Sequence, residues 1–151
     1  MDLDNEALAQ LDIVIGSVHS YMNMEAGPMT ERLLRALENP YVNVIGHPTG
    51  RILLRREGFP FDFERVATEA GKRNIHFEIN AQPDRLDLPA HLLRIAKSKG
   101  VKFIISTDAH HVRHLDFMRY GVWMARRGWL GPPDVLNTQD AEGFRAALRR
   151  N

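Results

Sequence analysis

The chain of 151 residues contains no cysteine. This absence excludes disulfide bonds, thiolate zinc sites and a cysteine nucleophile, and it fits a reducing compartment. The chain also lacks any run of roughly 18 apolar residues, and its acidic, polar start, MDLDNEALAQ, differs from the basic and then apolar start of a secretion signal. We therefore predict a cytoplasmic protein with no membrane partner.

A charge excess of either sign is missing as well. The sequence has 20 basic and 19 acidic residues, spread along the chain, for a net charge of +1. Composition therefore gives no reason to expect affinity for nucleic acid, so such a partner must be argued from a site. With 44% hydrophobic and 26% charged residues, the chain is typical of one globular domain that buries a core.

Four short runs rich in valine and isoleucine predict buried strands. They lie at residues 12–18, 43–46, 75–79 and 102–106. Apolar residues three and four apart predict helices at residues 29–37, 63–70 and 92–96, with two more at 115–127 and from about residue 141. Single helices between continuous apolar strands predict an α/β fold with parallel strands and right-handed crossovers.

Glycine and proline punctuate this pattern. Gly71 and Gly100 fall where the second and third helices are expected to end. Pro28 and Pro89 fall near helix starts, where proline is tolerated. The local signals therefore agree with the helical periodicity.

Polar side chains follow the predicted strands. His19 follows DIVIGSV, His47 follows VNVIG, and Asp108 and His110 follow KFIIST. In parallel α/β folds the carboxyl ends of the strands meet at one edge, which is where ligands bind. Imidazole and carboxylate groups suit Zn, Mn or Fe. We therefore predict a metal site formed by these four residues.

Each predicted ligand also has a structural alternative. A single histidine after a strand is often a hydrogen-bonded loop residue, as His19 or His47 would be. Asp108, in T-D-A-H, has the chemistry of a helix N-cap, although its pairing with His110 favours a site. The remaining histidines are expected to have ordinary structural roles: His76, His91, His111 and His114.

Three further polar residues lie near the strand ends. In HFEIN we expect Glu78 and Asn80 to point in opposite directions, and we assign Asn80 to substrate by hydrogen bonding rather than to metal. Arg51, in GHPTGR, is either a solvated loop residue or a planar fork for a phosphate group.

A basic pair beside a tryptophan allows two interpretations. Arg126 and Arg127 could hold nucleic acid by charge while Trp129 stacks on a base. The structural alternative is a charge pair at a helix end over a packed tryptophan.

Several segments together resemble a known family. IGSVHS, ENPYVNVIGHPTGR, FEINAQPDRLDLP, FIISTDAHHVRHLDFMRYGVWMARRGW and DVLNT are similar to the C-terminal part of the PHP (polymerase and histidinol phosphatase) domain of bacterial and archaeal family X DNA polymerases. GHPTGR and STDAH are specific in combination. The resemblance implies a distorted seven-stranded β/α barrel with a metal cluster at the carboxyl ends of its strands, which hydrolyses phosphoesters and acts as a 3′ to 5′ exonuclease.

The resemblance also implies roles for single residues. His19 matches the ligand after the family's fourth strand, His47 the ligand after the fifth, and Asp108 with His110 the D-x-H pair after the last. Two or three ions of Zn, Mn or Fe would activate a water for attack on a DNA 3′ end in repair. Asp108 and Arg51 would take part in catalysis, with Arg51 neutralising phosphate charge.

The chain departs from the family at its start. The H-x-H motif after the family's first strand, a further histidine and a bridging glutamate have no match here. We therefore expect residues 1–151 to be a partial PHP domain of about four βα units, a truncated fragment with little or no activity alone. Such a half barrel would leave apolar side chains uncovered, which predicts a homodimer or assembly with the missing strands.

Two other functions fit the same pattern. A half barrel could be a non-catalytic binding or structural module that assembles with another chain. Alternatively, a parallel β/α fold with His and Asp ligands could be an amidohydrolase-like metalloenzyme that cleaves C–N bonds. The native metal, the substrate and the oligomeric state are left open by the sequence.

Overall fold

A parallel sheet forms the centre of the computed structural model, which describes residues 2–148. Its strands are β1 (Ile15–Gly16), β2 (Val44–Ile45), β3 (His76–Asn80) and β4 (Phe103–Ser106). They pair in chain order, β1-β2-β3-β4, and every pair is parallel. The predicted α/β class is confirmed, although β1 and β2 are shorter than the apolar runs that predicted them.

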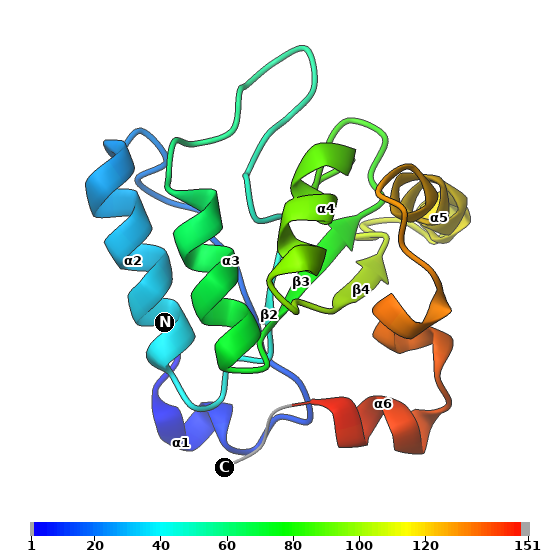
Figure 1. Ribbon diagram of the computed structural model, residues 1–151, viewed down its shortest axis with the longest axis horizontal. Helices are drawn as coiled ribbons and strands as arrows, with labels where there is room; N and C mark the ends of the chain where they lie inside the picture. The colour runs from blue at the N-terminus through cyan, green and yellow to red at the C-terminus, as the bar shows by residue number, and fades with distance from the viewer. Residues whose placement is uncertain (1, 149–151) are drawn as a thin grey trace.

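Helices follow each strand, and three of them lie side by side across one face of the sheet (Figure 1). They are α2 (Ala26–Glu38), α3 (Phe63–Lys72) and α4 (Ala90–Ser98). A short helix, α1 (Asn5–Leu8), precedes β1; after β4 come η1 (Val112–Phe117), α5 (Met118–Arg127), η2 (Pro132–Asp134), η3 (Leu136–Thr138) and α6 (Ala141–Ala147). The predicted positions of Pro28, in the first turn of α2, and Pro89, the N-cap of α4, are confirmed.

The two faces of the sheet carry different side chains because successive strand residues point to opposite sides. Phe77 and Ile79 enter the main core beneath the helices. Val44 and Ile104 form a small second cluster with Leu136 of η3, against which Phe144 of α6 packs. The C-terminal segment therefore covers part of the face that the helices leave open.

The prediction for Gly100 is confirmed, and Gly71 lies one residue before the end of α3 at Lys72. Gly71 lies inside α3, where a Cβ atom would come within 2.0 Å of the carbonyl oxygen of Lys99. The chain leaves α3 through Asn74, whose φ is +54°. Gly100 follows α4 with a φ of +82°, a conformation that favours glycine. Gly71 therefore permits close packing rather than ending the helix.

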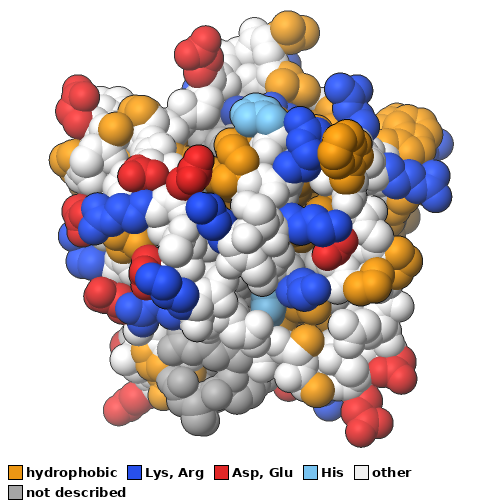
Figure 2. All heavy atoms as spheres, viewed as in Figure 1, with side chains coloured by type: hydrophobic (Ala, Val, Ile, Leu, Met, Phe, Trp, Pro, Cys, Tyr) orange, Lys and Arg blue, Asp and Glu red, His pale blue; other side chains and the backbone are white. Residues whose placement is uncertain are grey.

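Basic side chains gather on one part of the surface. Figure 2 shows Lys and Arg side chains beside exposed hydrophobic side chains over α4 and α5, at the upper right of the view. The sequence of α5, MRYGVWMARR, contains arginines and no acidic residue. Although the composition of the whole chain is nearly neutral, this part of its surface is basic.

The helices are short in relation to a lipid bilayer. A membrane-spanning helix needs about 20 apolar residues, and α2 has 13. Within residues 2–148 no helix has the length and apolar character needed to cross a membrane. The cytoplasmic location expected from the sequence stays a prediction.

Candidate metal and phosphoester site

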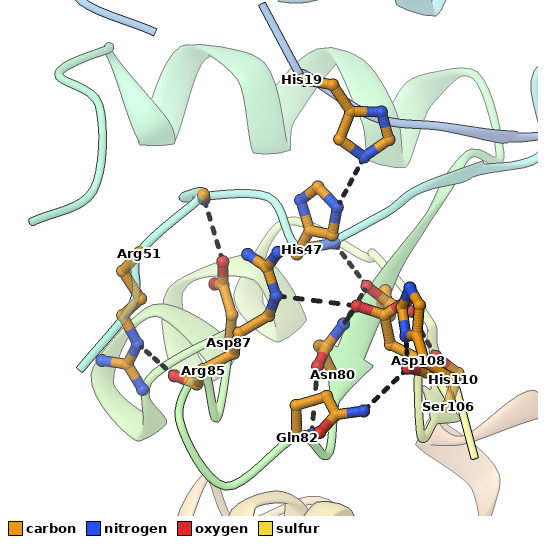
Figure 3. A network of polar contacts seen from close by, with 12 residues as sticks. His19, His47, Arg51, Asn80, Gln82, Arg85, Asp87, Ser106, Asp108 and His110 are labelled. Carbon is orange, nitrogen blue, oxygen red and sulfur yellow. Dashed lines mark hydrogen bonds and ion pairs between the residues drawn. The ribbon is translucent and has the colours of Figure 1, made fainter. Parts of the chain in front are cut away.

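The loops after the four strands bring polar side chains to one edge of the sheet (Figure 3). His19 follows β1 and His47 follows β2, and their Nε2 atoms lie 3.2 Å apart. Their ring centroids are 5.1 Å apart, with the planes tilted by 50°. The two histidines thus converge as the sequence led us to expect, and their role as metal ligands stays a prediction.

His47 is buried and firmly placed. Its backbone N–H donates to Oε2 of Glu78, which fixes a residue whose φ is +28°. Its Nδ1 atom is buried and has no hydrogen-bond partner within residues 2–148. Burial lowers the pKa of His47, the positive charge of Arg85 lowers it further, and the carboxylate of Glu78 acts in the opposite direction. The neutral imidazole, which is the form that binds metal, is therefore favoured.

Glu78 lies at the centre of a polar network, which the sequence did not suggest. Its Oε2 also accepts a hydrogen bond from Nδ2 of Asn80, and its Oε1 accepts one from the hydroxyl of Ser106. The expectation that Glu78 and Asn80 point in opposite directions is wrong, because residues two apart in a strand share a face. The feature of the sequence that could have indicated this role is the charged Glu78 within the predicted strand.

Asn80 joins this network to Asp108. Its Nδ2 donates to Oδ2 of Asp108 at 3.2 Å, while its Oδ1 accepts from the backbone N–H of Gln82. The amide of Gln82 donates in turn to the backbone carbonyl of Asp108 at 2.7 Å. Asn80 therefore holds protein groups in this structure, and its contact with substrate stays a prediction.

Asp108 is placed by strained backbone rather than by a helix cap. Its φ is +48°, an uncommon conformation for a residue other than glycine. The N-cap of the following η1 is His111, whose side chain accepts from the N–H of Arg113. The N-cap alternative for Asp108 is therefore wrong, and its carboxylate is directed to Asn80 and towards Arg85.

His110 is more exposed than Asp108. Its Nδ1 is 2.7 Å from the backbone oxygen of Asp108, and the side chain is exposed. The backbone N–H of His110 donates to Nδ1 of His114 at 3.3 Å. His114 also lies 3.2 Å from Nε2 of Gln82, so it supports the loop that carries His110.

The four predicted ligands therefore form two pairs at one edge, His19 with His47 and Asp108 with His110 (Figure 3). Hydrogen bonds through Glu78 and Asn80 link the two pairs. Within residues 2–148 no three His, Cys, Asp or Glu side chains are grouped closely enough to hold a metal ion. The His19–His47 separation of 3.2 Å nevertheless fits two ligands of one ion. Nitrogens bound at about 2.0–2.1 Å in a tetrahedral site lie roughly 3.3 Å apart.

Arg51 is directed away from these pairs. Its Nε donates to the backbone oxygen of Arg85 at 2.8 Å, and its Nη2 donates to that of Leu86. Burial lowers the pKa of Arg51, and the nearby Asp87 acts in the opposite direction. In Figure 3, Arg51 lies beyond Asp87 from His19 and His47. Its role as a phosphate fork stays a prediction.

No family model matches the chain. It is 42% identical over its full 151 residues to the DNA polymerase/3′-5′ exonuclease PolX of Bacillus subtilis. The resemblance to the PHP domain of family X DNA polymerases is confirmed. The PHP-like chain is also 30% identical over 119 residues to a probable phosphatase of Clostridium novyi, and 34% identical over 120 residues to one of Caldanaerobacter subterraneus.

The chain spans only part of these relatives. It covers 26% of the Bacillus protein and 46% and 44% of the two phosphatases, which align with 73% of the chain. The activities in their names belong to proteins that are much longer than the aligned segment.

Two polar residues at this edge were not predicted from the sequence. Arg85 places its Nε 3.6 Å from Oδ2 of Asp108, and its buried Nη1 has no hydrogen-bond partner within residues 2–148. Asp87 accepts hydrogen bonds from the backbone N–H groups of Thr49 and Gly50, each at 3.0 Å. Both residues come from QPDRLDLP, a loop whose polar side chains carry no periodicity that would indicate their direction.

Proposed function

We propose that this chain carries part of a divalent-metal-dependent phosphoesterase site, with His19, His47, Asp108 and His110 as ligands. The observation that carries the proposal is the His19–His47 pair, with Nε2 atoms 3.2 Å apart at the carboxyl edge of the sheet. Burial lowers the pKa of His47, which supports the proposal because a neutral imidazole can coordinate a metal. The names of the relatives, an exonuclease and probable phosphatases, support phosphoester chemistry.

The ions proposed are Zn, Mn or Fe, two or three in the complete site. A bound ion of this kind polarises phosphoryl oxygens and lowers the pKa of a coordinated water to about 7. The chain's own contribution is placement: Glu78 fixes the backbone of His47, and Asn80 fixes the carboxylate of Asp108. Arg85, whose Nε lies 3.6 Å from Oδ2 of Asp108, is better placed than Arg51 to meet substrate charge near Asp108.

We propose further that the four βα units form the C-terminal half of a PHP-type barrel. The edge at β1 supports this, because it borders a cavity of about 630 Å³ lined by β1 residues and α2. Ile15 of β1 is 45% exposed there. In this proposal further strands of the barrel pair along β1 and supply the remaining ligands, and the substrate is a DNA 3′ end in the cytoplasm, as in repair.

Metal content tests the proposal directly. The chain is treated with a chelator, dialysed against Mn²⁺ or Zn²⁺, and its bound metal is measured by mass spectrometry. We expect weak binding that the double variant His19→Ala with His47→Ala abolishes, while His91→Ala on α4 keeps the wild-type stoichiometry. Equal metal content in all three proteins would refute the ligand assignment.

Hydrolysis provides the second half of this test. With Mn²⁺ and bis-p-nitrophenyl phosphate, the chain is expected to be far slower than a complete PHP domain, since each ion has too few ligands here. Any hydrolysis that occurs should disappear in the double histidine variant. Activity that survives in that variant would place the chemistry elsewhere.

A further inference from the structure

A second cavity, of about 720 Å³, lies over the first turn of α4. Its lining includes Arg51, His91, Arg94, Arg127 and Trp129, and we call it the Arg–Trp pocket. The predicted metal ligands are absent from its lining. Of the residues predicted for phosphoester chemistry, its lining contains Arg51 alone, so the pocket is distinct from the metal-ligand edge. It lies on the part of the surface where basic and hydrophobic side chains gather in Figure 2.

Trp129 gives this pocket an open aromatic face. Its side chain is 77% exposed, so the alternative of a tryptophan packed beneath the arginines is wrong. Its backbone has a left-handed conformation, with φ +61°. The N–H of Trp129 donates a hydrogen bond to the backbone oxygen of Arg126, and Nζ of Lys97 donates one to the carbonyl of Trp129. Exposing a large ring to water on a strained backbone costs free energy, and a partner that covers the ring would offset this cost.

The arginines beside Trp129 have no anionic partner among the residues that the structure describes. The guanidinium of Arg94 lies 5.4 Å from the centre of the Trp129 ring, and its Nη1 donates to the backbone oxygen of Arg127. Neither Arg94 nor Arg127 forms an ion pair within residues 2–148. No acidic side chain is among the described residues that line the pocket. The pocket thus presents cationic forks next to a flat ring.

We propose that the Arg–Trp pocket binds one nucleotide unit of a single-stranded nucleic acid. A base stacks on Trp129, and the adjoining phosphate is held by Arg94 and Arg127, because guanidinium groups match phosphate oxygens in planar, paired hydrogen bonds. Stacking selects an unpaired base over a duplex, whose bases are covered by their neighbours. The volume of the pocket is typical of a small-ligand site.

This inference goes beyond the proposed phosphoesterase, because it concerns binding without metal or bond cleavage. The pocket nevertheless adjoins that site through one loop. Leu86, which lines the pocket, neighbours Arg85, which faces Asp108.

Fluorescence anisotropy with a fluorescein-labelled oligothymidylate, measured in a chelator, tests the pocket. We expect Trp129→Ala to weaken binding by about fivefold or more, the effect of one lost stacking contact. Trp129→Phe should retain most of the affinity. Arg94→Ala and Arg127→Ala should each lower the slope of log Kd against log salt by about 0.7, the value for one single-strand phosphate contact.

Matched controls separate the pocket from the general charge of the surface. Trp123→Ala removes the other tryptophan, which is 54% exposed on α5, and Arg126→Ala removes the neighbouring arginine; neither residue lines the pocket. Both should bind the oligonucleotide within about twofold of wild type. Circular dichroism of each variant should show an unchanged helical content. Equal affinities of the pocket variants and these controls would overturn the proposal.

The fluorescence of Trp129 can also report whether the nucleic acid contacts this residue. The chain has two tryptophans, so Trp123→Phe leaves Trp129 as the sole tryptophan emitter. Oligothymidylate should quench its fluorescence, free thymidine monophosphate should do so only at much higher concentration, and polyphosphate should not. Quenching by the mononucleotide alone, or displacement of the oligonucleotide by polyphosphate with equal potency, would contradict a single-stranded ligand.

Removal of metal distinguishes this proposal from the preceding one, because the pocket needs no ion. The chain should keep its Trp129-dependent binding of the oligonucleotide in a chelator. Binding that requires Mn²⁺, with Trp129→Ala unaffected, would assign the nucleic acid to the histidine edge and overturn the pocket. Failure of metal binding or hydrolysis with intact, Trp129-dependent binding would overturn only the phosphoesterase.

Discussion

Asp87 is a fully buried carboxylate whose Oδ2 atom accepts three hydrogen bonds. The donors are the backbone N–H and hydroxyl of Thr49 and the N–H of Gly50, and its Oδ1 has no partner within residues 2–148. Burial raises the pKa of Asp87 to about 6, against the effect of those hydrogen bonds and of Arg51. A residue outside the predicted ligand set thus fixes the loop that carries His47.

The pKa of Asp87 predicts how stability changes with pH. The group binds its proton more tightly in the folded chain, where its pKa is about 6, than when unfolded, where it is 3.8. Its contribution to folding is therefore complete below about pH 4 and is lost as pH rises through about 6, a change on the order of 3 kcal/mol. Asp87→Asn cannot ionise, yet its amide oxygen can accept the same hydrogen bonds. Urea unfolding should show the variant gaining stability relative to wild type between pH 4 and 7.

The control for this prediction is Asp62→Asn, which changes a carboxylate that caps α3 at the surface. Its stability difference from wild type should not rise over the same pH range. A difference between Asp87→Asn and wild type that is constant with pH would show that Asp87 titrates as an ordinary surface carboxyl group.

The elements were largely predictable from the sequence because the strands are apolar runs and α2, α3 and α4 carry an apolar stripe. Periodicity could not show that β1 and β2 are only two residues long, since their length depends on pairing across the sheet. The site was predictable to the extent that His19 and His47 converge, because strand ends share an edge. The contacts of Glu78, Arg85 and Asp87 could not be predicted from the sequence, since they depend on side-chain directions.

The role of Gly71 predicts opposite effects for two similar substitutions. In Gly71→Ala the new Cβ would meet backbone, the carbonyl oxygen of Lys99 at 2.0 Å, so α3 or the turn after α4 must shift. We expect a loss of about 1–3 kcal/mol or more in the free energy of unfolding. Gly27→Ala, in α2, has nothing within 4 Å and should be neutral or stabilising by up to about 1 kcal/mol. Thermal melts of both variants would measure this; similar melting temperatures would contradict the packing argument.

The whole molecule leaves less of its sheet uncovered than the half-barrel pattern predicted. β4 is not an open edge, because the side chain of Asn137 both accepts from the N–H of Ile105 and donates to its carbonyl, as a neighbouring strand would. Val44 and Ile104 are buried against the C-terminal segment. The sequence did not reveal this cover, since Asn137 lies in a 3₁₀ turn with no apolar periodicity.

β1 is the edge at which the chain is still expected to associate. Ile15 is 45% exposed, and Leu11 at the same cavity is 43% exposed. An apolar edge strand favours pairing with another chain, and a charge on it opposes pairing. We therefore expect light scattering at micromolar concentration to show a dimer or larger species for the wild type and a shift towards monomer for Ile15→Lys. Leu54→Lys, at a fully exposed loop position away from β1, should leave the distribution unchanged. A wild-type chain that is monodisperse at 17.3 kDa would mean that the C-terminal cover alone satisfies the sheet and that β1 needs no partner.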